Sequence, residues 1–265
     1  MLSLLTINIG AAAQARAERL LDWLAGRDED VFLLTETSAG TGTAHLLQRF
    51  ARAGYAVVKT DDIGDRGAAL ISRVQVVDEV VALSKVSIPG RVAAAVLDTE
   101  PQLTVAAVYV PSRDASVEKT ERKRAFVDSL LHGLEGLPQH QREQLLLGGD
   151  YNVIARTHKP PHRGFLPFEY GLLDGLAEHG LLDAHDHHVP GPHPHSWIGR
   201  TGDGYRYDYM HLATALADRI TACTYLHETR ERGLTDHAAV TLTLDIHATR
   251  LPVTNPRDND EIALF

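Results

Sequence analysis

The sequence predicts an α/β protein in which two β-sheets pack face to face and helices cover their outer faces. Strand-like and helix-like segments alternate along the chain without a linker. Helices fall mostly in the connections while several strands follow one another directly, which favours two packed sheets over one doubly wound parallel sheet. The length of 265 residues fits one layered domain, expected over residues 1–250, with a weakly ordered tail at 251–265.

The first half of the chain supplies most of the expected strands. Apolar runs at 2–8 and 31–36 are typical of buried strands, and a helix at 14–26 lies between them. A second helix is expected at 43–53. Turn residues then separate a series of strands, at 55–59, 68–72, 74–83, 92–97 and 103–110.

The second half begins with a long amphipathic helix at 115–136. Its apolar side chains Phe126, Leu130, Leu131 and Leu134 fall on one stripe, which predicts that this face packs on a sheet. A buried strand at 145–147 and a helix near 168–179 follow. The remaining strands are expected near 195–198, 206–212, 219–226 and 238–246.

Composition limits the function classes. The formal net charge of −9 argues against a protein that coats nucleic acid, although an enzyme could still bind DNA locally. No apolar run reaches the roughly 20 residues of a membrane span. The apolar start lacks a basic region and a cleavage site, so it is expected to be a strand and not a signal peptide. A lone cysteine, Cys223, fits a reducing cytoplasm.

Polar residues end many of the expected strands. They are Asn8, Glu36, Tyr109, Asp150 with Asn152, Asp208, and Asp236 with His237. One such residue means little, but together they supply carboxylates from different strands, a histidine, amides and a phenol. Turns alone do not explain this set.

The set fits phosphoester chemistry. Carboxylates with water suit Mg²⁺, which usually shares its shell with phosphate. Glu36 would hold the ion, Asp150 would take a proton from water, and His237 would donate a hydrogen bond to a phosphoryl oxygen. Neighbouring strand residues point to opposite faces, so Asp208 and not Asp236 is expected to orient His237, which leaves Asp236 near the metal.

The sequence resembles the endonuclease/exonuclease/phosphatase superfamily, and within it the exonuclease III-like apurinic endonucleases. The matching motifs occur in family order over nearly the whole chain. They are Asn8, LLTET at 33–37, RGAALISR at 66–73, YVPS at 109–112, GGDYNV at 148–153, GFLPFEYGLLDGL at 164–176, HSW at 195–197, YRYDYMHLA at 205–213 and TDHAAV at 235–240.

The resemblance implies a four-layered α/β-sandwich and Mg²⁺-dependent phosphoester hydrolysis, with Mn²⁺ tolerated. It places Asn8, Glu36 and Asp236 at the metal, Asp150 and Asn152 at the attacking water, and His237 with Asp208 at the phosphate. Tyr109 and the GFLPFEYGLLDGL segment favour the exonuclease III branch. Tyr205 and Tyr207, which flank Arg206, match positions where the family places apolar groups around a base-free sugar. With Trp197 they are expected to form that wall, and Arg206 is expected to contact the substrate as well.

The chain departs from the family pattern at two positions. Ser38 stands where the family commonly has lysine, and Ser112 stands where it often has asparagine or glutamine. Both changes could remove contacts to phosphate or to the metal shell. They favour an alternative function, a metal-dependent phosphatase of a small phosphoester.

Three further segments need an interpretation. The basic segment 156–163 follows the GDYNV loop, so Arg156, Lys159 and Arg163 are expected to contact a phosphate strand. The basic segment 120–124 is expected to be a solvated helix face. The segment 183–195 holds five histidines, but its prolines and glycines predict a loop with no fixed ligand spacing.

The expected function is thus a cytoplasmic, monomeric DNA-repair nuclease that uses Mg²⁺ and an Asp150-activated water. Its partner would be DNA bound locally at the site, without a membrane. The phosphatase is the main alternative, and a non-catalytic binding protein on the same fold is a remote one, because every expected acid is present.

Overall fold

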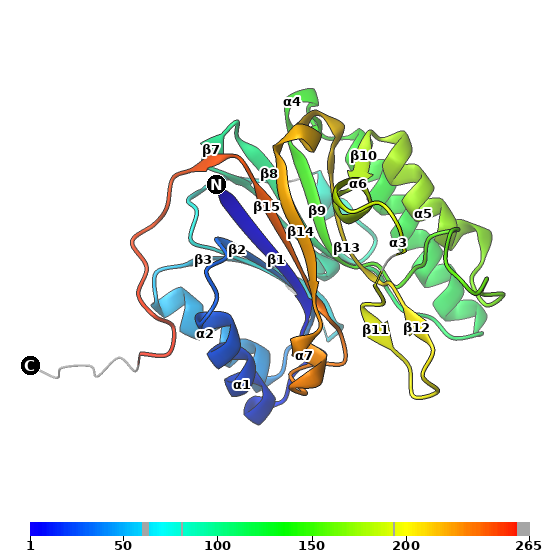
Figure 1. The fold of residues 1–265 in the computed structure, drawn as a ribbon, viewed down its shortest axis with the longest axis horizontal. Helices are drawn as coiled ribbons and strands as arrows, with labels where there is room; N and C mark the ends of the chain where they lie inside the picture. Colours follow the sequence, from blue (N-terminus) through cyan, green and yellow to red (C-terminus); the bar gives the residue numbers. More distant parts are fainter. Residues whose placement is uncertain (60–63, 81, 193, 259–265) are drawn as a thin grey trace, which may run out of the picture.

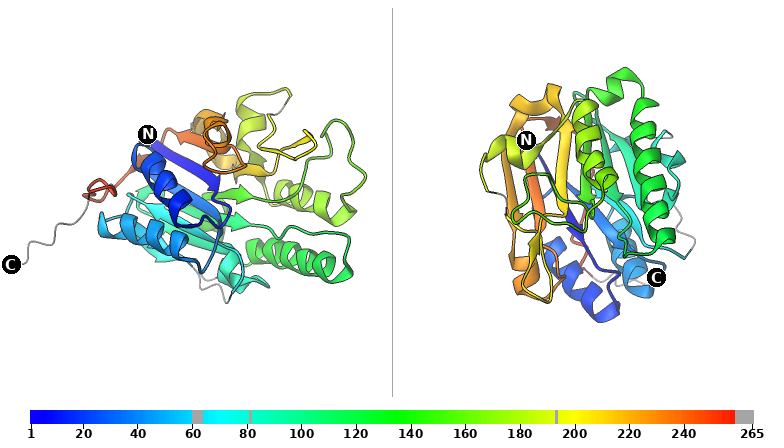
Figure 2. Two further views of the ribbon diagram at one scale, coloured as in Figure 1. Left: turned by 90° about the horizontal axis from the view of Figure 1, so that it is seen from below. Right: turned by 90° about the vertical axis from the view of Figure 1, so that its right-hand side faces the viewer.

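The computed structural model describes residues 1–59, 64–80, 82–192 and 194–258. Two mixed six-stranded sheets lie face to face, and helices cover the outer face of each, as Figures 1 and 2 show. This arrangement confirms the predicted α/β-sandwich of four layers. Among the described helices, none is both long and apolar enough to cross a bilayer.

The first sheet joins both ends of the chain. Its strand order is β14 (Ile220–Leu226), β15 (Ala239–Leu244), β1 (Leu2–Asn8), β2 (Val31–Thr37), β4 (Gly67–Ser72) and β3 (Ala56–Val58). The second sheet has the order β10 (Leu181–Asp183), β13 (Asp208–Ala213), β9 (Leu145–Asp150), β8 (Leu103–Tyr109), β6 (Val92–Leu97) and β5 (Val76–Glu79). Two small antiparallel pairs complete the strands, β11 (Trp197–Ile198) with β12 (Gly204–Tyr205), and β16 (His247–Ala248) with β7 (Thr99–Glu100).

Amphipathic helices cover the two outer faces. Helices α1 (Gln14–Ala25) and α2 (Thr41–Arg52) bury Leu20 and Phe50 against the first sheet. Helices α3 (Val117–Glu135) and α5 (Pro167–Glu178) pack side by side on the second sheet (Figure 1). The shorter helical segments are α4 (Gln139–Arg142), α6 (Ala184–His188), α7 (Glu228–Glu231) and the 3₁₀ turns Leu83–Lys85, Pro89–Arg91 and Thr214–Arg219.

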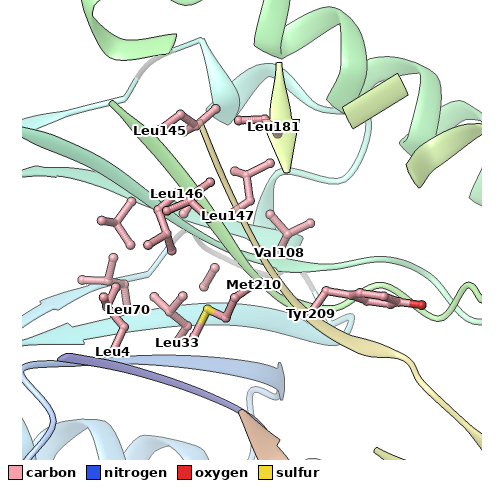
Figure 3. Packing of buried hydrophobic residues seen from close by; sticks show 14 of the residues in the cluster. Leu4, Leu33, Leu70, Val108, Leu145, Leu146, Leu147, Leu181, Tyr209 and Met210 are labelled. Carbon is pink, nitrogen blue, oxygen red and sulfur yellow. The ribbon is translucent and has the colours of Figure 1, made fainter. Parts of the chain in front are cut away.

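The core between the sheets is closely packed at the glycine pair before Asp150. Figure 3 shows Leu33 of β2 and Met210 of β13 meeting in the middle of this core. A Cβ on Gly148 would lie 2.6 Å from Leu33 Cδ1 and from Met210 Sδ. A Cβ on Gly149 would lie only 1.9 Å from the Val108 carbonyl oxygen. Packing therefore requires a glycine at 149 and favours one at 148, which lets β9 bring Asp150 to the sheet edge.

Several local expectations differ from the structure. The strand expected at 74–83 is only β5, because the segment turns into a 3₁₀ helix at Leu83–Lys85. The histidine-rich segment is not entirely a loop, because Asp183 accepts hydrogen bonds from His185 N and Asp186 N and caps α6. Residues 251–258 run back past α2, where Thr254 N donates to Ala53 O (Figure 1). The end of the expected tail, 259–265, lies outside the described residues.

Candidate active site

The strand directions bring the polar strand ends to one edge of the sandwich. β1 and β2 run parallel, so Asn8 at the end of β1 lies beside Thr35 and the following Glu36. β8 and β9 also run parallel, with Tyr109 in register with Asp150. β13 runs antiparallel to β9 and places Asp208 opposite Asp150. Residues distant in sequence therefore meet where the two sheets face each other.

One hydrogen-bond network joins the amides and two of the carboxylates. Asn8 Nδ2 donates to Asp150 Oδ2 at 2.8 Å and to Glu36 Oε2 at 3.1 Å, while Asn8 Oδ1 accepts from Gly10 N. Asn152 donates from its backbone N to Asp150 Oδ1 at 2.9 Å and from Nδ2 to Asp150 Oδ2 at 3.2 Å. Both oxygens of Asp150 are thus fixed in place.

Two residues of this network adopt a backbone conformation that non-glycine residues rarely use. Glu36 has a φ of 53° and Asn152 a φ of 49°. Ala11 N donates to Glu36 O at 2.7 Å, and Asn152 Nδ2 also donates to Val110 O at 3.0 Å. Such conformations persist where surrounding contacts hold them, and they cluster at functional sites.

His237 and Asp208 form a buried pair across from Asp150. His237 Nδ1 lies 2.7 Å from Asp208 Oδ2, and Ser196 Oγ accepts from Asp208 N at 3.1 Å. Burial alone would lower the pKa of His237, but the charge of Asp208 outweighs it and raises the pKa to about 10. His237 is therefore an imidazolium at neutral pH, and its second ring nitrogen, which has no partner among the described residues, can donate to a substrate.

Asp150 is poised to exchange a proton near neutral pH. Burial raises the pKa of Asp150 to about 7, against the opposing charge of His237 and with a further contribution from Asp208. Asp150, Asp208 and His237 each offer a ligand atom within 4.8 Å of the others. Within the described part of the chain, Asp208 Oδ1 is buried without a hydrogen-bond partner. The carboxylate oxygens fit a hard divalent cation, whereas the protonated His237 cannot act as a ligand.

Tyr109 enters the same cavity as a neutral hydrogen-bond donor. Burial, then the charges of Asp150 and Glu36, raise the pKa of Tyr109 well above its usual range. The Arg91 guanidinium lies 4.5 Å from the centre of its ring and supports it from behind. The phenol therefore stays protonated.

Glu36, Tyr109, Asp150, Asn152 and His237 line one open cavity of about 590 Å³, and Asn8 and Asp208 hold them from behind. Its other wall is aromatic and belongs to the β11–β12 hairpin and the segment after it. Tyr205 and Tyr207 stack at 5.4 Å, and Trp197 lies 5.8 Å from each ring. Trp197 Nε1 donates to Asp236 Oδ2 at 2.9 Å, which fixes the exposed Asp236 at the rim. The cavity thus pairs a polar, acid-rich floor with a flat apolar wall.

The sequence profile of the Endonuclease/Exonuclease/phosphatase family matches residues 5–241. The chain belongs to this family. Enzymes of the family are metal-dependent hydrolases of phosphoester bonds, and this chain is accordingly a hydrolase of that class. The family assignment made from the sequence is therefore confirmed. No match was found among curated proteins.

Solved structures of DNA-processing enzymes share the fold. An AP endonuclease from Archaeoglobus fulgidus is 22% identical with a TM-score of 0.76, covering 92% of this chain and 100% of that chain. The 3′ phosphatase NExo from Neisseria, bound to a product DNA hairpin, is 21% identical with a TM-score of 0.75 and the same coverage. The 3′-5′ exonuclease NExo from Neisseria meningitidis is 23% identical with a TM-score of 0.72, again covering 92% and 100%.

The structure places a buried lysine, Lys123, beside the active site, and the sequence analysis did not predict this position. Lys123 Nζ donates to Asn152 O and to Glu169 Oε1, each at 2.7 Å, and Arg113 Nη2 lies 2.5 Å from Glu169 Oε2. Lys123 is 1% exposed, so 120–124 is not simply a solvated helix face as expected. The signal was present in the sequence, because Lys123 falls three residues before Phe126 on the apolar stripe of α3.

Four residues expected to bind substrate lie outside the catalytic cavity. Arg206 is buried, and its guanidinium forms an ion pair with Asp183 at 2.7 Å and donates to the Tyr225 hydroxyl. Arg156 is paired with Asp174 at 2.7 Å on the surface. Lys159 and Arg163 are exposed, and Lys159 lines a separate cavity of about 560 Å³ together with Arg206. Arg206 therefore packs behind the aromatic wall, where Asp183 neutralises it.

Proposed function

We propose that the chain is a Mg²⁺-dependent phosphodiesterase, a DNA-repair nuclease of the exonuclease III type. It would cleave 5′ to an abasic site or remove nucleotides from 3′ ends, leaving a 3′-hydroxyl. The observation that carries this proposal is the Asp208–His237 pair facing Asp150 in one cavity, opposite a stacked aromatic wall. Structural neighbours that include an AP endonuclease and a DNA-bound enzyme support DNA as the substrate.

The chain's own residues divide the work of a single displacement. Asp150, held by Asn8 and Asn152, takes the proton of the attacking water. The His237 imidazolium and the Tyr109 hydroxyl donate to the phosphoryl oxygens, where negative charge grows in the transition state. Asp208 orients His237 and keeps it charged. No covalent intermediate is needed, because the water attacks phosphorus directly.

Glu36 would hold the Mg²⁺ ion, and Asp236 would lie near the ion at the rim of the cavity. Asn8 would keep Glu36 in place, because its amide donates to both Glu36 and Asp150. A bound Mg²⁺ ion would neutralise phosphate charge and stabilise the leaving oxygen. The Glu36 carboxylate is suited to this because, among the residues that the structure describes, its Oε1 has only a distant contact, with Arg66 at 3.7 Å. We assign the activity to residues 1–250 as one domain and place it in the cytoplasm, in keeping with the free, buried Cys223.

A second candidate is a phosphatase of a small phosphoester. The acidic net charge of −9 favours it, as does Ser112, which lines the cavity where the family often has an amide. Ser38 favours it as well, because it stands where the family commonly has lysine and its Oγ accepts a hydrogen bond from Gly40 N in the turn before α2.

The deciding assay uses a labelled duplex with one abasic-site analogue, an intact duplex and a panel of phosphomonoesters, each with Mg²⁺ and with chelator. Mg²⁺-dependent incision at the analogue is expected. Asp150→Asn should lose roughly 10²–10⁴-fold in kcat. The matched control is Asp128→Asn on the exposed face of α3, which should keep full activity. Phosphate release from a monoester without cleavage of either duplex would establish the phosphatase instead.

A further inference from the structure

A second cavity lies behind the aromatic wall of the active site. It measures about 560 Å³, which is within the roughly 300–1,000 Å³ of small-ligand sites. Its lining comes from the segment after GDYNV, from the histidine-rich segment and from the beginning of β13. Among the described residues, none lines both cavities. The catalytic residues therefore make no use of this second cavity.

The two cavities lie on opposite sides of the aromatic wall. Tyr205 and Tyr207 line the catalytic cavity, whereas Arg206 between them lines the second cavity. Such a division is expected where neighbouring side chains of an extended chain alternate. On the far side, His158 lines the second cavity and stacks on Tyr205 at 5.4 Å, with 14° between the rings. Groups on neighbouring nucleotides of one strand can thus enter the two cavities from either side of the wall.

Flat groups dominate the inside of the second cavity. The rings of His158 and His195 lie 6.0 Å apart, inclined at 46°. The Arg206 guanidinium lies 4.6 Å from the centre of the Tyr209 ring. Unpaired nucleobases stack on aromatic side chains and on guanidinium planes. The shape of the lining therefore suits a planar ring.

The charges of the lining favour a neutral ring over a phosphate. Arg206 is buried, and each of its terminal nitrogens lies 2.7 Å from an oxygen of Asp183, which neutralises it. Burial, then the charges of His195 and His162, lower the pKa of His158. His158 is therefore uncharged at neutral pH and presents an apolar face to a ligand.

Polar groups at the rim can bind the edge of such a ring. Thr157, Lys159 and Asp186 line the cavity and are exposed. They offer a hydroxyl, an ammonium donor and a carboxylate acceptor, which together match the mixed donors and acceptors of base edges. The backbone of Asp186 is fixed in α6, because its N–H donates to the capping Asp183.

We propose that the second cavity binds an unpaired nucleobase of the substrate strand while a phosphodiester of the same strand lies at Asp150. The proposal rests on the proposed function and deepens it, because it makes a base-bearing neighbouring nucleotide part of the substrate. A base must leave the duplex to enter the cavity, and this costs least beside a damaged or unpaired position. An oligonucleotide occupies both cavities at once, whereas a small phosphoester occupies only the catalytic one.

The test uses 2-aminopurine, a fluorescent adenine analogue whose emission depends on stacking. Duplexes with one abasic-site analogue carry 2-aminopurine at a single position, on either side of the analogue, and are titrated with the protein in chelator. His158→Ala removes the stacking ring and His158→Phe keeps a flat ring. The matched control is His132→Ala, whose side chain is 86% exposed on α3. Thermal melts show that each variant is folded.

Binding should change the emission at one position and leave the other positions unchanged. His158→Ala should abolish this change and raise the Kd by roughly fivefold to a hundredfold, the effect of removing one base–aromatic stack. His158→Phe should keep both the change and the affinity. The ratio of kcat/KM for the duplex to that for bis(p-nitrophenyl) phosphate should fall in His158→Ala and stay constant in His132→Ala.

Two results would overturn the proposal. Equal emission changes at all positions, or a change that persists in His158→Ala, would show that no base enters the second cavity. Binding of free 2-aminopurine riboside as tightly as the strand would show a separate small-molecule site and not a part of the substrate site.

The two proposals fail in different ways. If the parent chain cleaves the duplex with Mg²⁺ but no position changes its emission, the base cavity is wrong while the nuclease stands. If one position reports a base stacked on His158 but the duplex is never cleaved, the cavity stands and the nuclease assignment is wrong.

Discussion

At the scale of single residues, the site depends on how firmly Asp150 is held. Its two oxygens accept three hydrogen bonds from the amides of Asn8 and Asn152. Asn152 is in turn anchored from below by Lys123, through a 2.7 Å bond to its carbonyl oxygen. A general base must lie within hydrogen-bond reach of its proton, so Lys123 is a positioning residue for the reaction.

Lys123→Met should therefore lower kcat by about tenfold to a hundredfold, because small displacements of a catalytic group are costly, and leave KM nearly unchanged. Glu169 keeps its bond to Arg113 in this variant, which limits the loss of stability. Steady-state kinetics with thermal melts would test this, with Arg124→Met as control and Lys123→Arg as partial rescue. A rise in KM at constant kcat would instead show that Lys123 contacts the substrate.

At the scale of elements, β9 reaches the site edge only because two glycines precede Asp150. Gly149→Ala would place a Cβ against the Val108 backbone of β8, which cannot move aside. It should destabilise the fold by roughly 3 kcal/mol or more. Gly148→Ala meets only the side-chain ends of Leu33 and Met210 and should cost about 1–2 kcal/mol.

Chemical denaturation would measure both changes, with Gly171→Ala as the control. A Cβ on Gly171 of α5 meets nothing within 4 Å, so this substitution should stabilise the fold by about 0.5–1 kcal/mol. Equal effects at Gly148 and Gly149 would show that strand spacing does not constrain Gly149.

The same strands show what the sequence could and could not predict. Apolar runs ending in polar residues predicted the sheets and the set around Asp150, because strand ends are local signals. Pairings between distant side chains leave no such signal. The Lys123–Glu169 pair joins helices α3 and α5, and the Asp183 carboxylate that neutralises Arg206 lies 23 residues before it in the sequence.

At the scale of the whole molecule, the two sheets each contribute one side of the acidic site. Glu36 comes from the first sheet, whereas Asp150 and Asp208 come from the second. Bringing these charges together opposes folding unless a cation or a proton neutralises them. A divalent ion that binds only the folded chain therefore links the two sheets and should raise the melting temperature.

Added Mg²⁺ should stabilise the chelator-treated chain by about 2.7 kcal/mol at a hundredfold excess over its Kd, a shift of roughly 5–10 °C. Glu36→Gln should abolish this shift, whereas Glu178→Gln on the exposed end of α5 should keep it. The Asp208→Asn variant shows which residues hold the ion. If this variant keeps the Mg²⁺-dependent rise in melting temperature, the ion lies at Glu36, as proposed. Loss of the shift in Asp208→Asn but not in Glu36→Gln would place the ion among Asp150, Asp208 and His237. In that case His237 would be a ligand and could not be the charged donor to the phosphate.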